Sequence, residues 1–166
     1  MGALTKLVDA ILFVFFLVIA IGAPLLDSQT CLPSHIFPGF LKNLKSWYTH
    51  EHGDYLFTEK PHFFVGLVWV ELLFGWPLSI ASLYGIVAGK SWFRTACLMH
   101  GVNTLTATAA IVSELLGSGK ASEKLLKLYV PFLGFGVLAI VRGLLPHSQK
   151  STANGTQPIK SRKKRA

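Results

Sequence analysis

Four long apolar stretches divide the sequence, and each is long enough to cross a lipid bilayer as a helix. They cover residues 7–26, 63–88, 95–116 and 125–145, and Pro24 closes the first of them. About 20 residues in helical conformation span the roughly 30 Å of hydrocarbon in a bilayer. Because no water satisfies backbone groups there, each stretch must be helical. The pattern predicts an all-α integral membrane protein built as a four-helix transmembrane bundle.

The second stretch contains an acid, Glu71, within residues 63–77, which otherwise form a typical membrane span. A charged group at mid-bilayer costs about 2.5–3.5 kcal/mol on insertion scales. An ionisable residue at this depth usually faces a cavity or a partner rather than lipid. Glu71 therefore indicates a pocket inside the bundle.

Composition agrees with a membrane protein. The chain has 166 residues, of which 51% are apolar and 14% charged, and its mean hydropathy is +0.48. A soluble domain of this length needs more charge to cover its surface. We expect one membrane domain, residues 1–146. Residues 147–166 contain too little apolar mass to fold, so we expect a disordered basic tail.

The distribution of charge predicts the orientation in the membrane. Four spans place both termini on one side, which carries six basic residues of the tail together with Lys6, Lys90, Arg94 and Arg142. On the other side, acidic residues dilute the basic ones. The positive-inside rule therefore predicts cytosolic termini. A basic tail beside a span indicates contact with anionic membrane lipids, and we expect no nucleic-acid partner.

A short amphipathic helix is predicted in the loop between the first two spans. Its apolar face comprises Phe40, Leu41, Leu44, Trp47 and Tyr48. Such a helix lies at the membrane surface or caps the bundle. A role in packing and a role as a lid both remain open.

Two further acids flank the bundle. Asp27 closes the first span, and Asp54 lies shortly before the second. If the loop folds back, the two carboxyl groups meet at the mouth of the bundle and titrate as a pair that can hold an ammonium group. Spacing alone favours the simpler interpretation, two solvated acids at the interface.

Several other polar residues and two prolines are expected to shape the interior of the helix bundle. The third span places Asn103, Ala107, Ala110 and Glu114 on one face, where small residues allow close helix packing and Asn103 is the candidate cavity residue. The prolines Pro77 and Pro131 are expected to kink their helices and widen the bundle.

The remaining ionisable residues and cysteines suggest no special chemistry. Asp9 is expected to reach the interface or to pair with Lys6. Cys31 and Cys97 are expected on opposite sides of the bilayer, without a disulfide. The run from His50 to Asp54 lacks the spacing of a metal site, so we expect neither a metal nor a cofactor.

A set of short segments occurs in the order and spacing of a known family. The segments are Asp27-Ser28-Gln29 with Leu32-Pro33, the run from Phe40 to Tyr48, Asp54, Glu71-Leu72 with Phe74 and Pro77, the run from Trp92 to Thr95, Val102-Asn103-Thr104, and Tyr129-Val130-Pro131. Over residues 5–145 the chain resembles the sigma-2 receptor family. This family belongs to the EXPERA group, which also contains the emopamil-binding sterol isomerases.

The resemblance implies a homodimeric four-helix bundle in the endoplasmic reticulum, with a pocket that opens toward the bilayer and binds sterols and hydrophobic amines. It implies that Asp27 pairs with the ligand amine and that Asp54 supports Asp27. It also implies that Glu71 lines the pocket and that Tyr48 and Tyr129 lie nearby.

The chain also departs from the family. Gly75 stands where the animal receptors carry a larger polar side chain, Asn103 replaces a histidine, and Ala107 replaces a threonine. These departures predict a reshaped pocket.

Near the end of the tail, Lys163 and Lys164 resemble a dilysine signal for retrieval to the endoplasmic reticulum, which cytosolic coat proteins bind. This interpretation requires a cytosolic tail, in agreement with the predicted orientation.

Two functions follow as hypotheses. The first is a non-enzymatic receptor for a sterol or another hydrophobic ligand. The second is a sterol isomerase, for which Glu71, Asp54 and Trp69 or Trp76 could supply the acid, the base and the stabilisation of a carbocation. The related isomerases carry a histidine one turn before the acid of this span, and here the preceding histidine, His62, lies outside the helix. A scaffold with a vestigial pocket is the third possibility.

Overall fold

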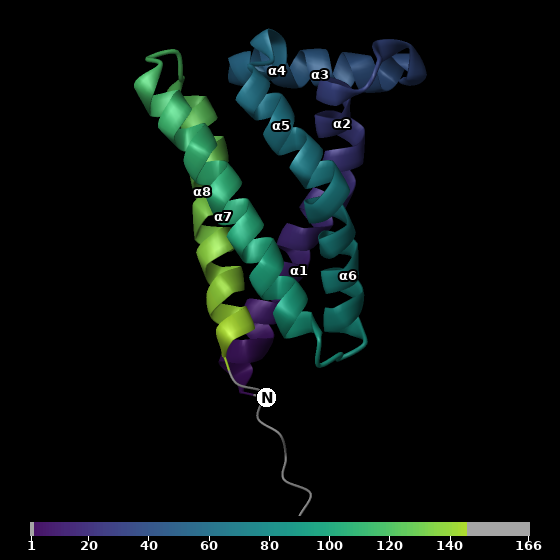
Figure 1. Cartoon of the computed structure of the whole chain (residues 1–166), viewed down its shortest axis with the longest axis vertical. Helices are drawn as coiled ribbons and strands as arrows, with labels where there is room; N and C mark the ends of the chain where they lie inside the picture. Colours follow the sequence, from purple (N-terminus) through teal and green to yellow (C-terminus); the bar gives the residue numbers. More distant parts are fainter. Residues whose placement is uncertain (1, 146–166) are drawn as a thin grey trace, which may run out of the picture.

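The structure, a computed structural model, describes residues 2–145, and Figure 1 shows a bundle of long helices. Four helical stretches are long and apolar enough to cross a membrane: Ala3–Cys31, His62–Val87, Phe93–Gly117 and Glu123–Leu144. Within residues 2–145 there is no β-strand. The prediction of an all-α protein with four membrane spans is confirmed.

The first two spans each combine two α-helices joined by one π-helical turn. The first consists of α1 (Ala3–Gly22), η1 (Ala23–Asp27) and α2 (Ser28–Cys31). The second consists of α5 (His62–Val70), η3 (Glu71–Gly75) and α6 (Trp76–Val87). The expectation that His62 lies outside this helix was therefore wrong, because His62 is its first residue. The third and fourth spans are the single helices α7 (Phe93–Gly117) and α8 (Glu123–Leu144).

Prolines accompany both π turns. In η1, which contains Pro24, the backbone N–H of Ser28 bonds the carbonyl of Ala23, five residues earlier. In η3, which ends just before Pro77, the N–H of Trp76 bonds the carbonyl of Glu71 in the same way. Proline cannot donate a backbone hydrogen bond and clashes with the carbonyl four residues earlier, so a local widening of the helix accommodates it.

The prolines do not end the helices that contain them. The expectation that Pro24 closes the first span was wrong, because the helix continues through the π turn to Cys31. Similarly, α8 runs through Pro131 as far as Leu144. The first span is therefore 29 residues long, and Asp27 lies inside it rather than at its end.

The two ends of the molecule carry different elements (Figure 1). The start of α1, the end of α8 and the turn between α6 and α7 lie together at one end. The opposite end carries α3, α4 and the turn between α7 and α8. This arrangement is the one required by an even number of spans.

The closest helix pair, α7 and α8, depends on glycines. A Cβ atom added at Gly101 would lie 2.9 Å from the carbonyl oxygen of Gly136, and one added at Gly136 would lie 3.0 Å from the amide nitrogen of Leu105. Small residues allow backbones to approach in this way in membranes. Close packing was expected instead on the face with Ala110, but that residue is exposed.

An ion pair joins the first and last spans. Arg142 donates to both carboxylate oxygens of Asp9, at 2.6 and 3.1 Å. Its guanidinium carbon lies 5.5 Å from the centre of the Phe93 ring. The expectation that Asp9 pairs with Lys6 was therefore wrong.

The predicted amphipathic helix is present as α3 (Gly39–His52), which follows the 3-10 turn η2 (Ser34–Ile36) and precedes the short α4 (Tyr55–Glu59). Its apolar residues divide between two faces. Leu41 is buried against the bundle, whereas Phe40 and Trp47 are 69% and 61% exposed. One face of α3 caps the bundle, and the adjacent face is free to contact the membrane surface.

Candidate functional site

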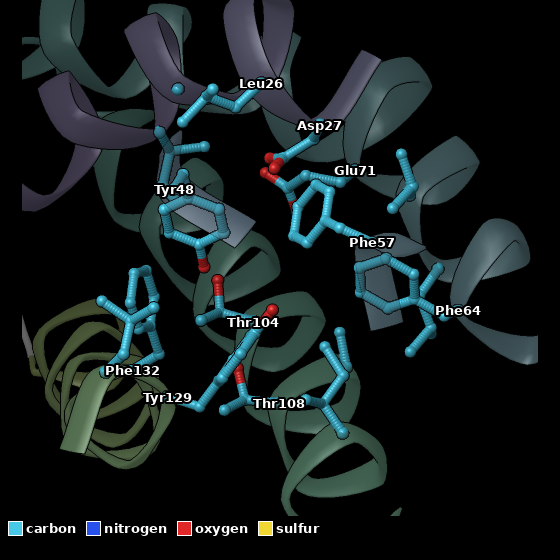
Figure 2. Close-up of a pocket in the computed structure, with 17 residues that line it drawn as sticks. Leu26, Asp27, Tyr48, Phe57, Phe64, Glu71, Thr104, Thr108, Tyr129 and Phe132 are labelled. Atoms are coloured by element: carbon cyan, nitrogen blue, oxygen red, sulfur yellow. The ribbon is translucent and has the colours of Figure 1, made fainter. Parts of the chain in front are cut away.

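A cavity of about 240 Å³ lies between the spans, beneath α3 and α4 (Figure 2). Its wall is mostly apolar and includes Phe57, Phe64 and Phe132. The polar side chains on its wall are Asp27, Tyr48, Glu71, Thr104, Thr108 and Tyr129. Four of the six residues predicted to bind ligand therefore border one cavity. Asp54 and Asn103 lie behind this wall.

The two π turns place the acids. Asp27 is the last residue of η1, and Glu71 is the first residue of η3. Figure 2 shows both carboxyl groups at the same end of the cavity, directed toward one another. Within residues 2–145, no hydrogen bond to the Asp27 carboxyl group is formed. The cavity thus has one acidic end and a largely apolar remainder.

Glu71 is oriented by the third span. Its Oε2 atom accepts a hydrogen bond of 3.2 Å from Nδ2 of Asn103, whereas its Oε1 atom is buried without a partner in the part of the chain described. A Cβ atom at Gly75 would overlap this carboxyl group. The absence of a side chain at Gly75 thus leaves room for the Glu71 side chain.

Asp54 is held by two tyrosines and by the start of α4. Its Oδ1 atom accepts from the backbone N–H of Leu56 at 3.1 Å, as an N-terminal helix cap. Its Oδ2 atom accepts from the hydroxyls of Tyr48 at 3.1 Å and Tyr129 at 2.9 Å. The side chain is only 1% exposed, so it supports the cavity wall from outside.

These contacts set the protonation behaviour of Asp54. Burial raises the pKa of Asp54 above its usual range, and the hydrogen bonds from Tyr129 and Tyr48 partly oppose this rise. Burial and the neighbouring carboxylate also raise the pKa of Tyr48. The tyrosines are therefore donors to Asp54, not acids.

The acids are paired differently from the sequence expectation. A direct meeting of Asp27 and Asp54 was considered, but Tyr48, Tyr129 and the backbone of Leu56 occupy the Asp54 oxygens. Asp27 faces Glu71 instead (Figure 2). Neither Asp27 nor Asp54 is a solvated surface residue, since Asp27 lines the cavity and Asp54 is buried behind its wall.

Sequence analysis missed a polar row on α7. His100 is completely buried, and its Nδ1 atom lies 3.1 Å from Oγ1 of Thr104, which lines the cavity together with Thr108. The spacing of four residues between these positions was a signal that could have identified the row, because it places all three on one helical face.

Other candidates lie away from the cavity. Trp76 donates through Nε1 to the carbonyl of Ala20 at 3.0 Å, and Trp69 is 40% exposed. Neither tryptophan lines the cavity. Between residues 2 and 145, no group of three or more His, Cys, Asp or Glu side chains could hold a metal ion. In the same region Cys31 and Cys97 are free thiols. Lys163 and Lys164 lie outside the described residues.

Comparison with known proteins identifies relatives. Residues 40–143 match the family described as EXPERA (EXPanded EBP superfamily). Sigma intracellular receptor 2 of Macaca fascicularis is 30% identical over 115 residues, which are 69% of this chain and 65% of that protein. The Homo sapiens protein of the same name is 33% identical over 92 residues, 55% of this chain and 52% of the relative.

The Xenopus tropicalis protein of that name is 25% identical over 154 residues, 85% of this chain and 90% of the relative. The chain thus spans about two thirds and about half of the length of the first two relatives, and most of the third. The family match covers more than half of the chain, and the predicted resemblance to the sigma-2 receptors is confirmed. This chain is a multi-pass membrane protein that belongs to the EXPERA family.

Proposed function

We propose that the protein is a receptor that binds a hydrophobic amine or a sterol in the cavity between its spans and regulates sterol handling in the endoplasmic reticulum. In this proposal the ammonium group of an amine pairs with the Asp27 carboxylate. Glu71 supplies the second acidic group, and Tyr48, Tyr129 and Asn103 hold the surrounding acids in place.

A single observation carries the proposal: a largely apolar cavity has two acids, Asp27 and Glu71, at one end. Apolar burial and one charge-assisted hydrogen bond are the two terms by which such a site binds an amphipathic amine. The Asp27 carboxyl group makes no hydrogen bond within the described chain, so it can accept one from a ligand without breaking a contact.

The volume of the cavity limits the size of the ligand that it can hold. Typical ligand pockets have volumes of about 300–1,000 Å³, and this cavity has about 240 Å³. It accommodates a compact amine or one end of a sterol. A whole sterol would require the surrounding side chains to move.

Binding to the purified full-length chain in detergent tests the proposal. Asp27→Asn should weaken a lipophilic tertiary amine by roughly ten- to a hundredfold, because a hydrogen bond to a charged group contributes about 1.5–3 kcal/mol. Glu51→Gln, which removes an exposed acid on α3, is the matched control and should leave affinity unchanged. Equal affinity in the wild type and Asp27→Asn would remove Asp27 from the binding site.

A sterol isomerase is the alternative. Two facing carboxyl groups, Asp27 and Glu71, could donate and accept protons. However, Leu67 occupies the position one turn before Glu71 and lines the cavity, where the enzymes carry a histidine. Expression in a yeast strain lacking the isomerase distinguishes the two functions. Growth that depends on Glu71 would favour the enzyme, and we expect no growth.

Location and assembly belong to the same proposal. We infer residence in the endoplasmic reticulum with cytosolic termini, retrieval by coat proteins through Lys163 and Lys164, and a homodimer. Replacing both lysines by serine should move a tagged full chain to later secretory compartments. Crosslinking in membranes tests the dimer, and a monomer at every concentration would contradict it.

A further inference from the structure

A second hollow lies at the end of the molecule that carries α3 and α4 (Figure 1). It is a cleft of about 350 Å³ between α3, α4 with Lys60, and the segment of residues 29–37. Three lysines line it, Lys42, Lys45 and Lys60, together with the hydroxyl-bearing side chains of Ser46, Thr49 and Thr58. No acidic side chain contributes to its wall. The cleft is therefore rich in hydrogen-bond donors and positive charge.

The surface acids nearby pair with other lysines, and of the three lysines in the cleft only Lys45 is favoured by an acid in the described part of the chain, Asp27 inside the bundle. At this end of the molecule, Glu59 pairs with Lys120 at 2.8 Å, Glu51 pairs with Lys124 at 2.9 Å, and Glu123 pairs with Lys127 at 3.3 Å. These three ion pairs are surface contacts of the neighbouring α7–α8 end. Across residues 2–145, no ion pair includes any of the three lysines in the cleft.

The charged form of Lys45 is destabilised by its surroundings in the cleft. Its Nζ atom donates to the backbone carbonyl of Gln29 at 3.0 Å and lies 5.5 Å from the centre of the Phe57 ring. Burial, and then the neighbouring Lys60 ammonium group, lower the pKa of Lys45 below its usual range. An anion placed between these two lysines would stabilise both charges.

The exposed residues of α3 indicate that the cleft lies near the depth of lipid headgroups. Phe40, Leu44 and Trp47 form the exposed apolar face of α3, and such a face inserts at the boundary between headgroups and acyl chains. Lys42 and Lys45 belong to the same helix but, with about 3.6 residues per turn, lie on the flank of α3 away from this apolar face. A phosphate group of a membrane lipid would be within reach of their ammonium groups.

We propose that this cleft binds a phosphate group, carried either by a phospholipid headgroup or by free phosphate. Phosphate oxygens accept hydrogen bonds from lysine ammonium groups and from hydroxyls, and such charge-assisted bonds are the strong ones. Lys42 and Lys60 hold the anion at the rim, and Lys45 reaches it from the inner wall. The cleft shares the Phe57 side chain with the acidic cavity but includes none of its acids.

Native mass spectrometry of the full-length chain in neutral detergent, titrated with phosphatidylglycerol, tests this site. Lys42→Gln combined with Lys60→Gln should weaken binding by at least about tenfold, since two charge-assisted contacts are lost. The control combines Lys124→Gln with Lys127→Gln, which removes the same charge from exposed lysines at the same end. The control should bind as the wild type does.

Inorganic phosphate distinguishes the two sources. If added phosphate displaces phosphatidylglycerol, the free ion is itself a ligand of the cleft. If the lipid stays bound and still depends on Lys42 and Lys60, the headgroup is the source. Equal weakening by the two double variants, or absence of saturable binding of either probe, would overturn the proposal. Lys42→Gln alone, at an exposed position, provides the same test if the double variant fails to fold.

Discussion

Tyr129 and Asp54 lie 75 residues apart in the sequence, and the Tyr129 hydroxyl donates a hydrogen bond of 2.9 Å to Asp54 Oδ2. The contact fixes the start of α4 against the fourth span and thereby closes one side of the cavity. Among residues 2–145, this hydroxyl is the only hydrogen-bond partner of the Asp54 side chain on the fourth span. The pair is therefore a joint between the loop and the bundle.

Tyr129→Phe should destabilise the protein by about 1.5–3 kcal/mol at neutral pH, the usual contribution of a hydrogen bond to a charged group. The pKa of Asp54 is raised in the folded state, so its ionisation costs stability. The protonated Asp54 carboxyl group therefore contributes stability that is fully present below the pKa of an aspartate in the unfolded chain. That stability is lost as the pH rises through the raised pKa of the folded state. Without the Tyr129 hydroxyl the pKa rises further, and the loss extends to higher pH.

Thermal unfolding of the full chain in detergent across a pH series measures this effect. Asp54→Asn is the control, because it removes the titrating group and should flatten this part of the profile. A Tyr129→Phe profile that coincides with the wild type would contradict the expected role of the joint.

The spans could be predicted from sequence because burial in lipid imposes one simple requirement, a long apolar helix. The pairing of Asp27 with Glu71 could not be predicted. It depends on two π turns, whose extra residue rotates the following helix and which no hydrophobic pattern reveals. The resemblance to a family identified both acids as pocket residues, but not that they face each other.

The Asp9–Arg142 pair was missed for a related reason. The two residues are separated by 133 positions. Asp9 has a nearer basic residue, Lys6, and Arg142 lies in the last turn of its helix, where a basic side chain usually reaches the membrane interface. Arg142 was counted only as a marker of orientation. Local spacing cannot show that the ends of the first and fourth helices meet.

Breaking this buried pair should be costly. Arg142→Met leaves the Asp9 carboxylate without its partner, and loss of one member of a buried pair costs about 3–5 kcal/mol. The double variant with Asp9→Asn should recover much of this loss, because no uncompensated charge remains. Unfolding in a double-mutant cycle measures the coupling. Lys127→Met, at an exposed pair, is the control and should change little. Simple additivity of the two changes would contradict the coupling.

Gly136 should tolerate no side chain. Any Cβ atom there meets the backbone of Leu105 at 3.0 Å and the carbonyl oxygen of Gly101 at 3.2 Å. Gly136→Val should therefore separate α7 from α8 and cost about 1–3 kcal/mol or more, as overpacking does. Gly134→Val is the matched control, because a Cβ atom at Gly134 meets nothing within 4 Å. Thermal unfolding compares the two, and equal losses would contradict glycine-dependent packing.

Gly75→Ala should change ligand binding through Glu71. The added methyl group overlaps the Glu71 carboxyl group, which is the end of a flexible side chain and can rotate away. The rotation breaks the hydrogen bond to Asn103 and alters the acidic end of the cavity. We therefore expect a shift in amine affinity with little loss of stability. In a double-mutant cycle with Glu71→Gln, contacting residues typically couple by about 0.5–3 kcal/mol. Binding measured in all four proteins tests this. If Gly75→Ala has the same effect with and without the Glu71 carboxylate, the glycine acts on the helix backbone alone. The proposed link between Gly75 and the pocket acid would then be wrong.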